Sequence, residues 1–72
     1  MKSIIVKLGY VSDENNKVGH DFRLIEADKN EVLLEEINSD FILRIDKIRN
    51  LWIREGVIKI TTKNTTYILE IL

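Results

Sequence analysis

Residues 40–55 of the chain, DFILRIDKIRNLWIRE, fit two different secondary structures and therefore decide the fold class. Read as a helix, they place Phe41, Ile45, Ile48 and Trp52 on one face at spacings of four, three and four. Gly56 would then stop the helix at its C-terminal end. This interpretation gives an α+β protein.

The same residues also fit two short strands. Phe41, Leu43 and Ile45 would line one face of the first strand, residues 46–50 would turn, and residues 51–53 would continue in the second strand. This stretch contains four isoleucines, a phenylalanine and a tryptophan but no alanine, which favours strands. We prefer the strands and keep the helix as the alternative.

The composition of the whole chain also favours strands. Among its 72 residues are 12 Ile, 8 Leu and 5 Val, against one Ala and no Pro or Cys. β-Branched side chains suit a pleated surface, and a chain of this length forms one domain, here residues 1–72. We therefore expect a mainly β domain, either a small antiparallel meander or a partly closed barrel of five to seven strands.

The N-terminal half reads as three strands with polar connections. We expect a strand over residues 4–11, a loop over 12–19, a strand over 21–27, a turn at 28–31 and the second strand of a hairpin over 32–37. In the first strand, alternation places Ile4, Val6, Leu8 and Tyr10 on one face. In the second, the alternation is imperfect, because Ile25 falls on the same face as Arg23.

The C-terminal residues form the best hairpin signal in the chain. Residues 57–62 and 65–72 are rich in β-branched and aromatic side chains, and Lys63-Asn64 joins them. The last strand is apolar on both faces, so it should lie centrally in the sheet or be covered by a second copy. We therefore expect a homodimer and assign the self-association contact to Tyr67, Ile68 and Leu72.

Charge is distributed unevenly along the chain. Residues 1–40 carry five bases and nine acids, and residues 41–72 carry six bases and three acids. The second half could therefore contact nucleic acid through Arg44, Lys47, Arg49, Arg54 and the ring of Trp52. A net charge of −1 disfavours binding that depends on phosphate contacts, so the same five residues are also candidates for contacting a protein partner.

Groups for enzymatic chemistry are few. His20 is the only histidine, and it follows a polar loop without a thiol to activate. The adjacent carboxylates Glu35 and Glu36 would point to opposite faces of a strand, so they form no acid–base pair and suggest solubility instead. We expect no catalytic residues, and therefore no enzyme.

Metal and cofactor sites are not indicated either. Asp13, Asn15 and Lys17 imitate the start of a calcium loop, but a lysine stands where an oxygen ligand is needed. With Gly9, Gly19 and Gly56 as the only glycines, no phosphate-binding loop can form. The sequence predicts no metal and no cofactor.

Two families share local features with the second half of the chain. Residues 42–49 and 52–60 resemble the swapped-hairpin barrel of AbrB-type transition-state regulators and antitoxins, which implies a dimeric DNA-binding protein. That family has Pro where Asp46 stands and one more residue before the Arg-Glu-Gly turn. The same stretch, extended to Leu69, resembles the middle strands of small bacterial pleckstrin-like domains, which continue into a helix. Each resemblance covers less than half of the chain, so we assign it to neither family.

Together these features predict a small protein without enzymatic activity. We expect an interaction or regulatory module that presents a surface to a protein partner, with a dimeric DNA-binding or antitoxin-like regulator as the alternative. No apolar run approaches the roughly 20 residues that cross a bilayer. We therefore expect a cytoplasmic protein that does not bind membranes.

Overall fold

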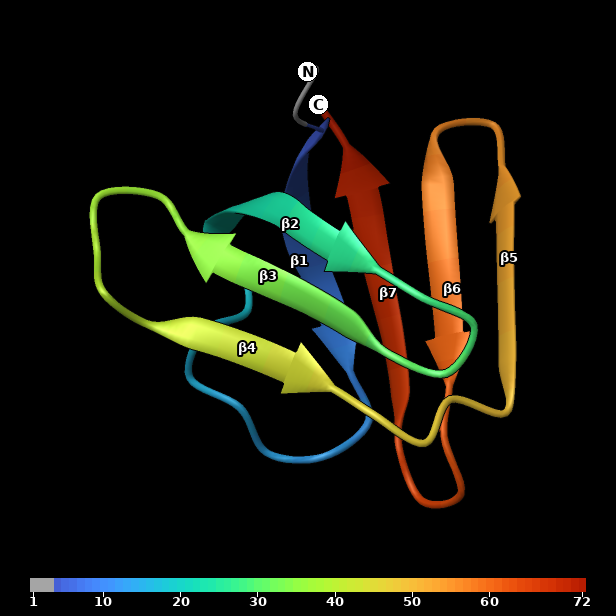
Figure 1. Cartoon of the computed structure of the whole chain (residues 1–72). Helices are drawn as coiled ribbons and strands as arrows, with labels where there is room; N and C mark the ends of the chain where they lie inside the picture. Colours follow the sequence, from blue (N-terminus) through green and yellow to red (C-terminus); the bar gives the residue numbers. More distant parts are fainter. Residues whose placement is uncertain (1–3) are drawn as a thin grey trace.

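Seven antiparallel strands form one continuous sheet in the computed structural model, which describes residues 4–72 (Figure 1). The strands are β1 (Ile4–Val11), β2 (Asp21–Ala27), β3 (Val32–Glu36), β4 (Ile42–Ile45), β5 (Asn50–Arg54), β6 (Val57–Thr61) and β7 (Thr66–Ile71). Their order in the sheet is β4-β3-β2-β1-β7-β6-β5. The predicted mainly β meander is confirmed.

Residues 40–55 form the two strands β4 and β5, so the alternative helix is wrong. Lys47, between the strands, has a φ of 53°, a left-handed conformation that interrupts any right-handed helix. Ile45 and Ile48 are buried, but Phe41 and Trp52, which the helix would place on the same face, are exposed. The α+β interpretation is excluded with the helix.

The sheet folds back on itself to enclose a core. Figure 1 shows β2, β3 and β4 in front of β1, and the turn between β2 and β3 in front of β7, so that the sheet makes two layers. The buried apolar side chains lie between these layers: Val6, Leu8, Phe22, Val32, Leu34, Ile45, Ile48, Ile58, Ile60 and Leu69. The barrel stays open, because among the described strands β4 and β5 share no contact although they follow each other in sequence.

An irregularity in β1 corrects the predicted face of Tyr10. The β1–β7 register shifts between Leu8 and Tyr10, and Tyr10 lies opposite Ile68 instead of continuing the buried row of Val6 and Leu8. Half of Tyr10 is therefore exposed. Gly9 lies between the two residues where the register shifts, and a Cβ there would lie 2.8 Å from Oε2 of Glu70, so a larger residue would displace this side chain.

A second irregularity explains the imperfect alternation of the second strand. The β2–β3 register shifts between Leu24 and Glu26, which moves the residues after Leu24 to new faces.

The C-terminal hairpin is confirmed as β6 and β7, and β7 lies centrally between β1 and β6. No helix long and apolar enough to cross a membrane occurs in the described part of the chain.

Candidate functional site

Strand β5 forms one edge of the sheet. Among the described strands it pairs with β6 alone, and the two are joined by Glu55 and Gly56, whose φ values are 51° and 77°. Two consecutive positive φ values are typical of a type I′ turn, whose twist matches that of the strands it connects. At the other end, the Arg49 amide donates a 2.8 Å hydrogen bond to the Thr61 carbonyl. These local contacts hold β5 in place without support from a second neighbouring strand.

Every residue of β5 is exposed, including three consecutive large apolar ones. The exposed fractions are 38% for Leu51, 40% for Trp52 and 62% for Ile53. We call these three residues the β5 patch; Trp52 lies on the outer face of the sheet, and Leu51 and Ile53 lie on the inner face, opposite Ile60 and Ile58. Single exposed apolar residues are ordinary, but a run of them on an open sheet edge offers both apolar surface and unpaired backbone groups. Such an edge is a ready site for pairing with another chain.

A row of side chains extends from β1 to β5 on the outer face of the sheet. Tyr10 lies opposite Ile68, Ile68 opposite Lys59, and Lys59 opposite Trp52, and directly opposite residues share a face. We call these four residues the outer row. The Arg54 guanidinium lies 5.5 Å from the centre of the Trp52 ring, within the range of a cation–π contact. The row therefore combines two aromatic rings with neighbouring cations.

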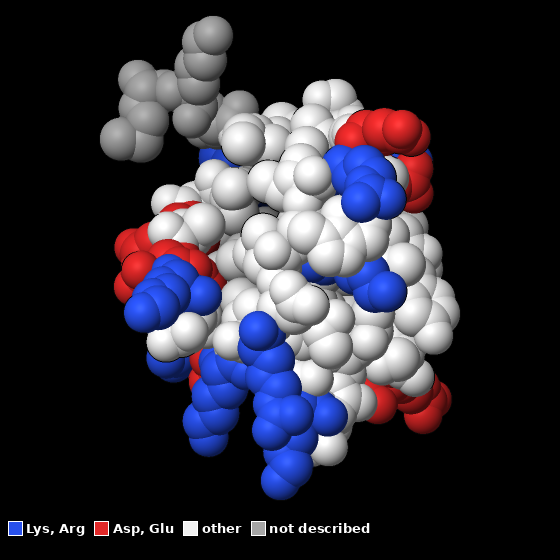
Figure 2. Space-filling model, turned by 90° about the vertical axis from the view of Figure 1, so that its right-hand side faces the viewer, with Lys and Arg blue, Asp and Glu red and all other residues white. Residues whose placement is uncertain are grey.

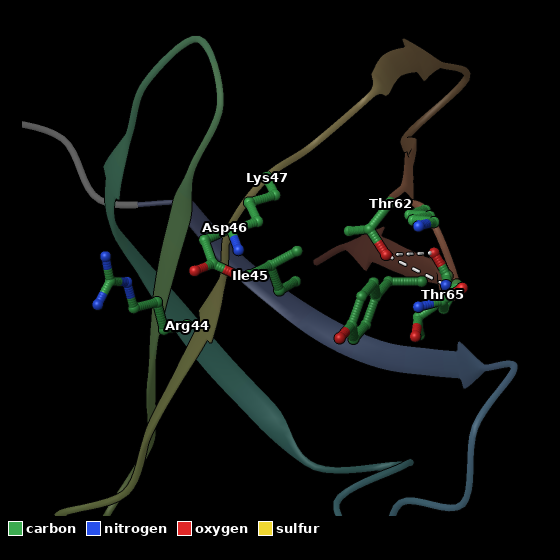
Figure 3. A pocket seen from close by; sticks show the side chains of 9 residues that line it. Arg44, Ile45, Asp46, Lys47, Thr62 and Thr65 are labelled. Atoms are coloured by element: carbon green, nitrogen blue, oxygen red, sulfur yellow. Dashed lines mark hydrogen bonds between the residues drawn. The ribbon is translucent and has the colours of Figure 1, made fainter.

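A cavity of about 350 Å³ lies between the end of β4 and the β6–β7 turn (Figure 3). It is lined by Arg44, Ile45, Asp46, Lys47, Thr62, Lys63, Asn64, Thr65 and Tyr67. Figure 3 shows the Arg44 guanidinium pointing away from the cavity. Arg44 pairs there with Glu31, and this partner raises the pKa of Arg44 above its usual value. Arg44 is therefore not available to a molecule in the cavity.

The two threonines of this cavity are also engaged by the chain itself. The Thr65 amide donates to Oγ1 of Thr62 over 3.1 Å, and the Thr65 hydroxyl donates to Asp13 Oδ2 over 2.5 Å. Burial, together with the carboxylates of Asp13 and Asp46, raises the pKa of Tyr67. The charged groups that this cavity keeps without an ion-pair partner among the described residues are therefore those of Asp46, Lys47 and Lys63.

Basic side chains gather near this end of the molecule. Figure 2 shows Lys and Arg side chains along the lower part of the face it presents, with a broad uncharged surface above them. Lys47 and Lys63 line the cavity, and neither forms an ion pair with another described residue. The uncharged surface and the basic end are therefore adjacent regions of one side of the molecule.

Glu36 is a buried carboxylate that our interpretation of the sequence missed. It is 7% exposed and ends the inward-facing series Val32, Leu34, Glu36 of β3. His20 Nδ1 donates a hydrogen bond to Oε2 of Glu36, and Lys17 Nζ lies 3.0 Å from Oε1. Alternation from Val32 would have indicated the inward position, but we attributed the adjacent pair of glutamates to solubility.

The contacts of Glu36 stabilise its charged form. The hydrogen bonds from His20 and Lys17 lower the pKa of Glu36 to about 2, against the opposing effect of burial. Lys17 also lies 4.7 Å from the centre of the Phe41 ring. Lys17 and His20 belong to the loop before β2, and Glu36 belongs to β3, so these contacts hold the loop against β3. This is a structural role.

The structure divides the predicted contact residues into two groups. Trp52 and Arg54 lie together on the outer face of β5, with Arg49 just before this strand, whereas Arg44 and Lys47 lie at the cavity. In the second group, Arg44 is paired with Glu31, whereas Lys47 has no ion-pair partner among the described residues.

The predicted self-association residues lie on or just beyond the central strand β7. Tyr67 lines the cavity and packs against the core, Ile68 belongs to the outer row, and Leu72 is exposed beyond the end of the strand. Both backbone edges of β7 are occupied by β1 and β6, so the edges available for pairing belong to β4 and β5. The sequence pattern did not identify these edges, because they depend on the order of the strands in the sheet.

Two further observations concern chemistry and relatedness. Within residues 4–72, no group of three or more metal-ligating side chains is placed to hold a metal ion. Comparison of the chain with protein-family models, curated proteins and solved structures finds no match.

Proposed function

We propose that the protein is a non-enzymatic interaction module that recognises a protein partner through the β5 patch and the outer row. The single observation that carries the proposal is the exposure of Leu51, Trp52 and Ile53 in succession on a strand with one free edge. The interaction would take place in the cytoplasm, in keeping with a chain whose apolar runs are all too short to cross a bilayer.

The side chains of this surface are those that dominate binding energies in protein interfaces. Tryptophan, tyrosine and arginine are the residues whose truncation most often weakens a complex, and Trp52, Tyr10 and Arg54 all occur here. Lys59 and Arg54 border the apolar part, so a complementary partner surface would be apolar with carboxylates at its rim.

Affinity capture with matched variants tests this proposal. The immobilised wild-type chain should retain a protein from an extract of the source cells, and Trp52→Ala should lose it. Ile25→Ala, which truncates a comparably exposed apolar side chain on β2, should retain it. Retention of the same proteins by all three chains would contradict the proposal, as would enzymatic turnover that disappears in His20→Ala.

DNA binding is a second candidate, favoured by the basic end of the molecule. Lys47 and Lys63 line one cavity without an ion-pair partner among the described residues, and Arg49 lies on the segment that leads to β5. A mobility-shift assay at low salt tests this candidate. If it binds DNA, Arg49→Ala should weaken binding and reduce the salt dependence by about one phosphate contact. No shift at high micromolar protein would exclude it.

A further inference from the structure

The free edge of β5 has a defined set of backbone groups. In an antiparallel ladder, residues alternate between those whose N–H and C=O groups face the neighbouring strand and those whose groups face away. The two-residue turn at Glu55-Gly56 is flanked by the pair Arg54 and Val57, which faces inward across such a turn. Leu51 and Ile53 therefore direct their backbone groups to the free edge.

The sequence of β5 and its flanks is complementary to itself when two copies run antiparallel. With Trp52 at the centre, Leu51 of one copy lies opposite Ile53 of the other, and their outward backbone groups meet. The same register brings Arg49 to the end of the second copy that carries Glu55. Neither Arg49 nor Glu55 has an ion-pair partner among the described residues, so both charges are available.

We propose that a second copy of this chain pairs with β5, antiparallel and centred on Trp52, so that two sheets become one. The inference rests on the same exposed strand as the proposed function and names one occupant of its edge. In the dimer, Trp52 of each copy lies beside the other on the outer face. The two outer rows then form one continuous surface with twofold symmetry, which presents a doubled site to a further partner.

The other free edge of the sheet does not offer the same complementarity. The Glu36 amide bonds to the Phe41 carbonyl, so Ile42 and Arg44 direct their backbone groups to this edge. Self-pairing of β4 about Leu43 would place these two residues opposite each other, and it would bring Asp40 opposite Asp46, so that like charges meet. The observations therefore favour β5 over β4.

The expected dimer is weak. Five residues from each copy make an interface smaller than the roughly 1,200 Å² at which stable complexes begin. We expect a dissociation constant between about 1 µM and 1 mM. Sedimentation equilibrium from about 10 µM to 1 mM should therefore show a shift from monomer to dimer.

Two sets of variants test the proposed register. Ile53→Pro removes an outward N–H from β5 and should weaken the dimer at least about tenfold, whereas Ile42→Pro at the β4 edge should leave it unchanged. Circular dichroism checks that both variants fold. Arg49→Glu and Glu55→Arg should each weaken the dimer about two- to thirtyfold, and the double variant should restore it, because the dimer contains two such charge pairs.

Several results would overturn this inference. These are a monomer at 1 mM, a dimer that survives a folded Ile53→Pro, a dimer lost in a folded Ile42→Pro, and failure of the double charge reversal to restore association. A monomeric chain that still captures a protein through Trp52 would remove the dimer and leave the proposed function. A dimer that captures no protein would remove the proposed function and leave the dimer.

Discussion

Ile53 lies directly opposite Ile58 in the β5–β6 ladder, yet 62% of Ile53 is exposed and only 5% of Ile58. Both side chains face the same side of the sheet. The difference therefore shows that the opposite layer covers β6 and ends before it reaches β5. The exposed strand is a consequence of how the sheet folds back, and it is the feature on which the proposed interaction depends.

The first prediction concerns the stability of the monomer. Ile58→Ala should lower the free energy of unfolding by about 2–4 kcal/mol, because it leaves a cavity in the core. Ile53→Ala should change it by no more than about 0.5 kcal/mol. Urea denaturation at low micromolar protein measures both. Equal losses would mean that β5 is covered, contrary to the structure.

The second prediction concerns acid pH. The pKa of Glu36 is lowered to about 2 in the folded protein, so its contacts with His20 and Lys17 contribute stability above pH 4.5, and this contribution is lost as the pH falls toward 2. Glu36→Gln should therefore be less stable than wild type near pH 6, and the two should converge near pH 2. The control is Glu35→Gln, which removes a carboxylate exposed beside Arg23.

Denaturation curves measured from pH 2 to pH 7 test the role of Glu36. A stability difference between wild type and Glu36→Gln that is the same at every pH would show that ionisation of Glu36 contributes nothing. A pH dependence removed equally by Glu35→Gln would assign the effect to general charge instead of to the buried cluster.

The third prediction concerns the turn that positions β5. Glu55 has a φ of 51°, a conformation that asparagine adopts more readily than glutamate. Glu55→Asn should stabilise the monomer by about 0.5 kcal/mol, whereas Glu55→Gln removes the charge without this backbone preference. Thermal unfolding at low concentration compares them. Equal effects of the two substitutions would assign the change to charge.

Much of the strand pattern could be predicted from local sequence. The hairpin of β6 and β7 follows from β-branched runs around Lys63-Asn64, and the strands over 40–55 follow from the same propensities. The face of Tyr10 could not be predicted, because it depends on a register shift at Gly9 that alternation does not record. The inward position of Glu36 was indicated by its alternation with Val32 and Leu34. Its partners Lys17 and His20 could not be predicted, because they come from a loop distant in sequence.

The candidate site was only partly predictable. Trp52 and Arg54 could be named from their chemistry, because aromatic and basic side chains alternate there. Two other features could not be predicted because they result from strand order: the ion pair of Arg44 with Glu31, and the central position of β7 with β5 at the edge. Strand order depends on contacts between distant segments, above all the pairing of β1 with β7.

Amide hydrogen exchange of Leu51 and Ile53, followed as the protein concentration rises, tests most directly whether β5 is a contact surface between copies. We predict that both amides exchange rapidly at about 10 µM and become protected toward 1 mM, while the outward Ile42 amide of β4 stays unprotected. Exchange of Leu51 and Ile53 that is equally fast at every concentration would contradict the account.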